Sequence, residues 1–287
     1  MSAIYNFKDI TIVIISYNSQ EVIGNCIKNF SNEQKMVVVD NASSDQSINI
    51  VRKLKPITLI IQNSVNKGYG SAVNQALSVV KTKYALLINP DAVMQVSDIS
   101  ILHQYAEAND NAGIVVPGSG WELHLKGPNG NTFNSSMPPL EGPFCSWFAS
   151  GAIWLLRHND WLVLNGFDEN IFLYSEDIDF CLRLRKDGKE IIVCPQSRAQ
   201  HQESTSAPLT KEIQWRKEWN IIWSHLYVTK KHDGKLKTQR VILQLLCRHV
   251  PKMIFHGLVF EKKRFWRDLA IVNATLSYIF GRKPKRD

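Results

Sequence analysis

The sequence lacks several features that would place it in a common class of protein. Its 287 residues include five cysteines, an odd number without Cys-x-x-Cys spacing, so we expect reduced thiols in a cytoplasmic protein. No apolar run reaches the ~18–20 residues that a membrane span requires, and the first residues lack the basic and apolar segments of a signal peptide. Neither Gly-x-Gly-x-x-Gly nor a Walker motif occurs, which disfavours a nicotinamide-dependent enzyme and an NTPase.

The net charge of +8 is distributed unevenly along the chain. Residues 205–287 contain 18 basic and 6 acidic residues, whereas residues 1–204 contain 16 basic and 20 acidic ones. The basic part is predicted to form amphipathic helices over 239–260 and 264–280, a pattern that favours an anionic membrane surface. A helical cap with a solvated basic face is the alternative. Nucleic acid is disfavoured because no recognisable nucleic-acid module accompanies the charge.

Short apolar runs alternate with helical patterns, which predicts an α/β fold with a mostly parallel sheet. The predicted strands cover 10–16, 36–39, 58–62, 84–88, 114–117 and 191–193, and the predicted helices among them cover 21–30, 47–54, 71–80 and 98–108. Residues 118–143 are rich in Gly, Pro, Asn and Ser and are predicted to form a long acceptor-side loop. We expect a catalytic domain over 1–205, with a nucleotide-binding half (1–95) and an acceptor half (96–205), followed by a helical region over 206–287.

Polar residues stand where the first three predicted strands end, and ligands bind at such ends in open α/β sheets. Asp40 could accept hydrogen bonds from a base or a ribose, although a helix N-cap is an equally good interpretation. Tyr17 could stack on a base, although an aromatic residue there is more often part of the core. Gly68 and Gly70 precede a predicted helix, where the backbone could approach a phosphate.

The sequence Asn89-Pro90-Asp91 ends the fourth predicted strand abruptly. A carboxylate beside an amide oxygen suits a hard divalent cation that also touches phosphate oxygens. By itself, such a turn is more often structural. His201, eight residues beyond the last predicted strand, could supply a further ligand, although a single histidine is usually structural.

Three carboxylates, Glu176, Asp177 and Asp179, stand before a predicted amphipathic helix. The helix macrodipole favours acids at this position, but it does not account for three of them in four positions, because they repel one another. The cluster is therefore a candidate general base.

Together these segments resemble glycosyltransferase family 2, the inverting transferases of the GT-A fold, and within it the rhamnosyltransferase-like bacterial members. The resemblance spans about residues 10–205, in the family's order, and rests on residues 13–18, 38–45, 66–70 with Asn74, 87–91, 166–169 and 176–177.

The resemblance implies transfer of a sugar, with rhamnose as the candidate in this subgroup, from a nucleoside diphosphate to a hydroxyl of a glycan or polyprenyl-linked acceptor. It also implies Mn²⁺ or Mg²⁺ on the diphosphate. Together with the basic C-terminal helices, this leads us to expect peripheral association with the inner face of the cell membrane. The implied roles are base for Asp177, supported by Glu176, and metal contact for Asp91 and His201. Further roles are nucleotide binding by Tyr17, Asn18, Asp40, Asn41, Lys67, Gly68 and Asn89, and acceptor binding by Trp147, Gly151 and Asp179. The family's metal motif is commonly Asp-x-Asp, and here Asn89 takes its first position.

Two rival functions are compatible with part of the pattern. A nucleotidyltransferase that makes the sugar nucleotide is disfavoured because no glycine-rich loop with Arg or Lys follows the first predicted strand. A non-catalytic sugar-nucleotide or polysaccharide-binding subunit is disfavoured by the intact Glu176-Asp177 pair. The sequence does not indicate an oligomeric state.

Overall fold

The computed structural model describes residues 7–118, 142–201 and 210–284. Of His201 it describes the backbone only. The chain forms two compact units. The sheet unit comprises Met1–Lys67, Ser71–Phe167 and Phe180–Ala207, and the helical unit comprises Gly68–Gly70, Asp168–Asp179 and Pro208–Asp287. Two short segments from the first part of the chain thus group with the C-terminal helices, where the sequence predicted a single boundary after residue 205. The predicted loop over 118–143 lies almost entirely outside the described residues.

An eight-stranded sheet with the order β3-β2-β1-β4-β8-β6-β9-β7 forms the centre of the sheet unit. Neighbours from β3 to β4 are parallel, as are β6 and β9, whereas β8 and β7 run antiparallel to their neighbours. This mostly parallel sheet confirms the predicted fold class. The strands are β1 Ile10–Ser16, β2 Met36–Asp40, β3 Leu59–Gln62, β4 Tyr84–Ile88, β6 Ala112–Pro117, β7 Phe144–Ser146, β8 Ile153–Arg157 and β9 Glu190–Cys194.

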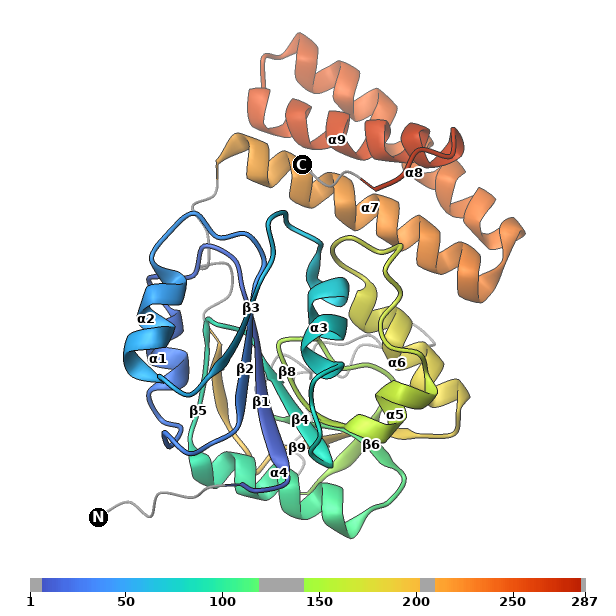
Figure 1. Ribbon diagram of the computed structural model, residues 1–287. Helices are drawn as coiled ribbons and strands as arrows, with labels where there is room; N and C mark the ends of the chain where they lie inside the picture. Colours follow the sequence, from blue (N-terminus) through green and yellow to red (C-terminus); the bar gives the residue numbers. More distant parts are fainter. Residues whose placement is uncertain (1–6, 119–141, 202–209, 285–287) are drawn as a thin grey trace. The chain divides into compact units, whose positions relative to one another are not determined.

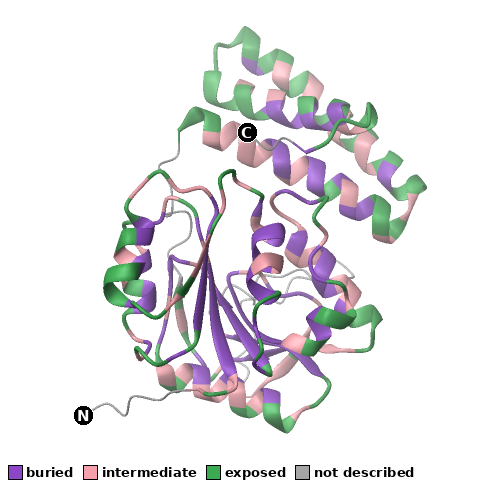
Figure 2. Ribbon diagram, viewed as in Figure 1, coloured by how far each residue is buried: buried purple, intermediate pink, exposed green. Residues whose placement is uncertain are grey.

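The central strands are buried because helices cover the sheet on both sides, with α1 and α2 on one side and α3 on the other (Figure 1). Figure 2 shows the strands as the most buried part of the unit. β1 and β4 consist almost wholly of apolar residues, and burying each large one stabilises the fold by about 1.5–3 kcal/mol. The helices are α1 Ile23–Ile27, α2 Ser47–Leu54, α3 Tyr69–Leu77, α4 Val96–Ala108, α5 His158–Val163 and α6 Glu176–Lys186.

One predicted helix is shorter in the structure, and one predicted strand lies at the edge of the sheet. The helix predicted over 21–30 is limited to Ile23–Ile27. β3 is partly exposed although its residues are apolar, because it is the edge strand and has a neighbour on one side only.

Three long helices, α7 Lys211–Asp233, α8 Lys235–Leu258 and α9 Lys262–Ile279, make up most of the helical unit. α8 and α9 agree with the prediction, whereas α7 has no counterpart among the predicted helices. It begins at Thr210, whose hydroxyl accepts a hydrogen bond from the Ile213 N–H at 3.2 Å. Trp219 and Trp223 of α7 pack with Ala274 of α9 in the core of this unit. Within the described ranges, no helix is both long enough and apolar enough to cross a bilayer.

Candidate active site

The carboxyl ends of β1 and β2 lie side by side in the sheet unit, because Ser16 pairs with Asp40. The Asp40 carboxylate is buried and accepts hydrogen bonds from the Ser43 N–H at 3.0 Å and from the Gln62 side chain at 3.3 Å. The bond to Ser43 belongs to the turn after β2, and the helix α2 starts only at Ser47. Asp40 therefore shapes the strand-end loop and does not cap the helix.

Asn41 joins the loops that follow β2 and β3. Its side-chain oxygen accepts from the Asn63 amide at 3.1 Å and from the Lys67 N–H at 3.0 Å, and its amide donates to Asn66 at 2.8 Å. An amide that both donates and accepts in this way fixes the positions of two loops at once. The structure thus places Asp40, Asn41 and Lys67 in one polar network at the carboxyl edge of the sheet.

The loop after β1 belongs to the same edge. Asn18 accepts from the Ser44 N–H at 2.8 Å, and its own N–H donates to the Ser43 hydroxyl at 2.9 Å. Asn18 and Ala42 have positive φ, a conformation that is strained for residues other than glycine and that is concentrated at ligand sites. The Tyr17 ring is 38% exposed, unlike a core aromatic, and can offer a face to a base.

Gly68 has a packing role that the sequence does not reveal. Its φ is +87°, and a Cβ at this position would lie 2.1 Å from the carbonyl oxygen of Phe172 in the helical unit. The same carbonyl accepts the Tyr69 N–H at 3.2 Å. Glycine is required here by the close approach of Phe172, and the Tyr69 N–H at the start of α3 is already engaged. The phosphate-binding role of Gly68 stays a prediction without geometric support.

The Asn89-Pro90-Asp91 turn links β4 to a short antiparallel pair of strands. The Asn89 N–H donates to Ala152 at 2.8 Å, and its carbonyl accepts from Ala92 at 3.0 Å. Asp91 is 8% exposed, and its charge adds to the effect of burial in raising the pKa of the Cys26 thiol to about 12.

β5 (Ala92–Met94) pairs with β10 (Ala199–His201), and the backbone of His201 lies opposite Ala92. This pairing brings residue 201 next to residue 91, although 110 positions separate them in the sequence. Oxygen donors from Asn89 and Asp91 suit Mn²⁺ or Mg²⁺ chemically. The side chain of His201, the further predicted ligand, lies outside the described part of the chain.

A different set of potential ligands lies at the amino-terminal side of the sheet. Among the described side chains, Asp9, His103 and Glu107 come close enough together to bind a metal ion. His103 is 2.7 Å from Asp9, and the Lys83 ammonium is 2.6 Å from Glu107, so ion pairs account for this cluster. It carries no argument for a metal.

Two predicted acceptor residues lie near the start of β8. Ala152, next to Gly151, accepts the Asn89 N–H, so this segment adjoins the Asn89–Asp91 turn. The indole N–H of Trp147 is buried and has no hydrogen-bond partner among the described residues. A buried indole donor normally has a partner, so an oxygen of a ligand would complete it.

The third acceptor residue, Asp179, lies in the helical unit with the candidate base. The segment ahead of α6 is strained, because Tyr174 and Ser175 have φ values of 64° and 67°. Glu176 is 8% exposed and its Oε2 has no hydrogen-bond partner among the described residues. Burial, reinforced by the adjacent Asp177 charge, raises the pKa of Glu176 to about 8. At neutral pH Glu176 is therefore protonated and uncharged.

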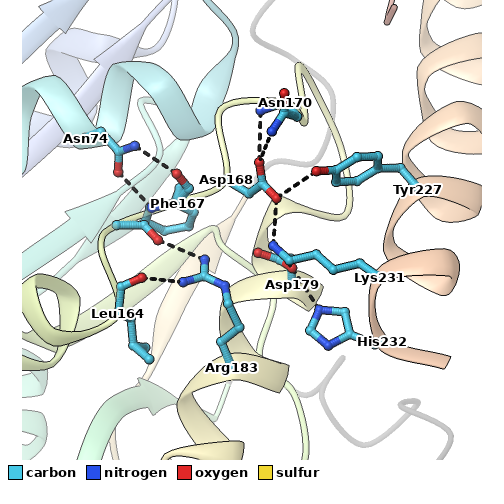
Figure 3. A network of polar contacts seen from close by, with 11 residues as sticks. Asn74, Leu164, Phe167, Asp168, Asn170, Asp179, Arg183, Tyr227, Lys231 and His232 are labelled. Atoms are coloured by element: carbon cyan, nitrogen blue, oxygen red, sulfur yellow. Dashed lines mark hydrogen bonds and ion pairs between the residues drawn. The ribbon is translucent and has the colours of Figure 1, made fainter. Parts of the chain in front are cut away.

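Asp168 and Asp179 are held by α7, as Figure 3 shows. Lys231 lies 2.6 Å from Asp168 and 2.8 Å from Asp179, and His232 lies 2.8 Å from Asp179. Asp168 also accepts from Tyr227 at 3.1 Å. Burial opposes ionisation of Asp168, but the bonds from Lys231 and Asn170 outweigh it and lower the pKa. Asp179 is fully buried, so the structure uses this carboxylate to anchor the segment, and its acceptor role stays a prediction.

Gly166 and Phe167 belong to one of the segments on which the resemblance rests, and they form a corner of the sheet unit. Figure 3 shows Phe167 with its polar contacts. The Asn74 side chain accepts a hydrogen bond from the Phe167 N–H at 2.8 Å and donates one to the Phe167 carbonyl at 2.9 Å. Arg183 donates to the carbonyls of Leu164 and Gly166, both at 2.8 Å. These residues position the chain just before Asp168. Their role is structural.

We expect Lys231→Met to destabilise the fold. Removing the cation shared by the buried Asp179 and the half-buried Asp168 costs about 3 kcal/mol, the lower end of the range for breaking a buried pair, because the Lys231 side chain is 31% exposed. Denaturant unfolding measures the loss. Lys230→Met, on the exposed neighbour in α7, is the matched control and should unfold like the wild type. Equal stability of the two variants would show that Lys231 does not anchor the segment.

Comparison with known proteins agrees with this arrangement. The model for glycosyl transferase family 2 matches residues 11–159. The rhamnosyltransferase WbbL of Escherichia coli K12 is 28% identical over 219 residues, which cover 66% of this chain and 82% of the relative. An N-acetylglucosaminyl-diphospho-decaprenol L-rhamnosyltransferase of Mycobacterium tuberculosis is 24% identical over 213 residues, which cover 60% and 67%.

A similar fold occurs in the mannosyltransferase PcManGT from Pyrobaculum calidifontis, solved in complex with GDP-Man and Mn²⁺. The two structures superpose with a TM-score of 0.59 and 13% sequence identity, over 96% of this chain and 88% of that one. This likeness shows a shared GT-A fold.

Proposed function

The chain belongs to glycosyl transferase family 2 and is a glycosyltransferase, and from this premise we propose that it moves a sugar from a nucleoside diphosphate to an acceptor hydroxyl with inversion. The observation that carries the proposal is the polar network at the carboxyl edge of β1 and β2. Asp40, Asn41 and Lys67 are held there by loop hydrogen bonds, beside the partly exposed ring of Tyr17. A base, a ribose and a diphosphate find their usual partners in such a set.

In the proposed reaction Asp177 accepts the proton of the acceptor hydroxyl as that oxygen attacks the anomeric carbon. The new glycosidic bond forms as the bond to the diphosphate breaks, and the leaving diphosphate retains the bonding electrons. Glu176 remains neutral at pH 7, because burial raises its pKa. A single displacement inverts the anomeric centre, so no protein nucleophile is needed.

A divalent cation would be held by Asp91 and His201, with Asn89 beside them, and when bound it stabilises the charge that develops on the diphosphate. The donor set is one carboxylate, one imidazole and an amide, with fewer charges than an Asp-x-Asp motif supplies. Either Mn²⁺ or Mg²⁺ is compatible with it.

We further propose a rhamnosyl donor and a lipid-linked or cell-surface glycan acceptor, with the protein at the inner face of a membrane. The support is that two curated relatives are rhamnosyltransferases, one of them named for a diphospho-decaprenol acceptor.

Thermal unfolding with a panel of nucleoside diphosphates and sugar nucleotides tests the donor site. A ligand at 100 times its dissociation constant should stabilise the fold by about 2.7 kcal/mol. We expect one nucleotide series to raise the melting temperature, and Asp40→Asn to abolish the shift. Slow donor hydrolysis by the wild type would distinguish an enzyme from a binding subunit. If no nucleotide stabilises the protein, the proposed function is wrong.

A further inference from the structure

The connection between α8 and α9 carries the most exposed large apolar side chain of the described chain. Phe260 is 85% exposed, Leu258 is 74% exposed and Phe255 is 59% exposed. Ile254, Val259 and Trp266 are also exposed, and we call this group of six exposed apolar side chains around the α8–α9 connection the elbow. In Figure 2 the connection between α8 and α9, at the top of the view, is exposed. Scattered apolar residues on a surface are ordinary, but six exposed ones within thirteen positions are a concentration of the kind that marks interaction surfaces.

The backbone of the elbow is strained at the residue that is most exposed. Phe260 has a φ of 56°, just after the C-cap of α8 at Val259. Helices commonly end in this left-handed conformation, but on glycine, which adopts it without a steric cost. A phenylalanine here makes the fold less stable and places an aromatic ring in solvent. Folding alone does not explain this choice of residue.

The elbow is ordered, although its side chains are exposed. The Phe260 N–H donates to Gly257 at 3.3 Å and the Glu261 N–H donates to His256 at 2.9 Å. His256 is itself buried and bound at 2.8 Å to Asp268 of α9, which also binds His249 at 2.9 Å. The elbow is therefore preformed, and binding would not have to order it.

The charges around the elbow indicate the nature of its partner. Residues 252–264 contain four basic residues and one acidic residue, Glu261. Lys252, Lys262, Lys263 and Arg264 are all exposed, so their charges surround the elbow. Long basic side chains flanking aromatic and aliphatic ones suit the boundary between anionic headgroups and acyl chains. A second copy of the chain would bring like charges together, which disfavours self-association through this surface.

We propose that the elbow is a membrane-docking surface, in which Leu258, Phe260 and their apolar neighbours enter the acyl region and the basic rim contacts anionic lipid headgroups. The bound species is the surface of an anionic bilayer. This deepens the proposed function, because a lipid-linked acceptor would be met at that surface. The position of the elbow also gives the basic C-terminal region a specific contact point, one that net charge alone does not provide.

Phe260→Gly is the decisive variant, because it removes the aromatic ring and relieves the positive φ together. The variant should melt at the wild-type temperature or above it, so that loss of binding cannot be attributed to unfolding. Co-sedimentation with phosphatidylcholine vesicles containing phosphatidylglycerol measures binding. We expect the variant to bind at least about tenfold more weakly, since burial of one large apolar side chain is worth that factor or more. Leu236→Ser, at the far end of α8 and 76% exposed, is the control and should bind like the wild type.

Added salt, and replacement of Lys262, Lys263 and Arg264 by Gln, should weaken binding further, and vesicles of phosphatidylcholine alone should bind poorly. Three results would each overturn the proposal. They are failure of the wild type to bind anionic vesicles at low salt, wild-type binding by Phe260→Gly, or light scattering that shows a dimer lost in Phe260→Gly. Vesicle binding needs no substrate, so its failure is separate from a failure of nucleotide binding or donor hydrolysis.

Discussion

Asp177→Asn should lower turnover by roughly 10²–10⁴-fold, the usual contribution of a positioned general base. Asparagine keeps the size and polarity of the side chain but cannot accept the acceptor proton. Donor affinity should be almost unchanged, because the nucleotide contacts are assigned to Asp40, Asn41 and Lys67. Turnover is measured with saturating donor, and donor affinity is measured separately by thermal shift or calorimetry.

Glu176→Gln is the matched control for this experiment. Glutamine imitates the protonated carboxyl that burial enforces below pH ~8, so this variant should retain most of its activity at pH 7. Above that pH Glu176 of the wild type becomes negatively charged, and the Gln variant does not. The two pH profiles should therefore diverge on the alkaline side. An active Asp177→Asn with an inactive Glu176→Gln would assign the base to Glu176, and full activity of both would refute the mechanism.

Asp91→Asn should lower the rate of transfer at least about 10²-fold, because the divalent cation that stabilises the charge on the leaving diphosphate loses its carboxylate ligand. Chelator should have the same effect on the wild type, and excess Mn²⁺ or Mg²⁺ should restore activity to the wild type but not to the variant.

Asp110→Asn is the control for Asp91→Asn, since Asp110 is an exposed carboxylate just before β6, at the opposite edge of the sheet from the turn after β4. It should be active, and both variants should melt close to the wild type. Wild-type activity that persists undiminished in chelator would make the Asn89-Pro90-Asp91 turn a structural feature only.

Local patterns in the sequence are sufficient to predict most of the sheet unit. The β-branched runs of β1 and β2 and the apolar run of β4 are buried strands, as predicted, because few other structures can bury such runs. The polar residues after these strands meet at one edge, because parallel strands share the direction of their carboxyl ends. The position of Asp40 and Asn41 at this edge of the sheet therefore follows from the sequence.

The helix α7 has a sequence signal that is weaker than those of the other long helices. Trp215, Trp219 and Trp223 recur at intervals of four residues, which is helical spacing, and Tyr227 continues the series. The many charged residues between them obscure this pattern. The partners of α7 in and just before α6 cannot be inferred from the sequence, because its contacts with Asp168 and Asp179 join positions more than fifty residues apart.

The sequence by itself determined the strands, their polar ends, the family resemblance and the cluster of acids at the start of α6, because each of these depends on residues that are neighbours in the chain. Only the tertiary structure decided that the pKa of Glu176 is raised to about 8, because burial, reinforced by the adjacent Asp177 charge, determines it. It likewise decided that residue 201 lies opposite Ala92, that Phe172 explains Gly68, and that Phe260 projects from a rigid elbow. These outcomes depend on burial, strand pairing and exposure, and all three arise from contacts between residues that are distant in the sequence.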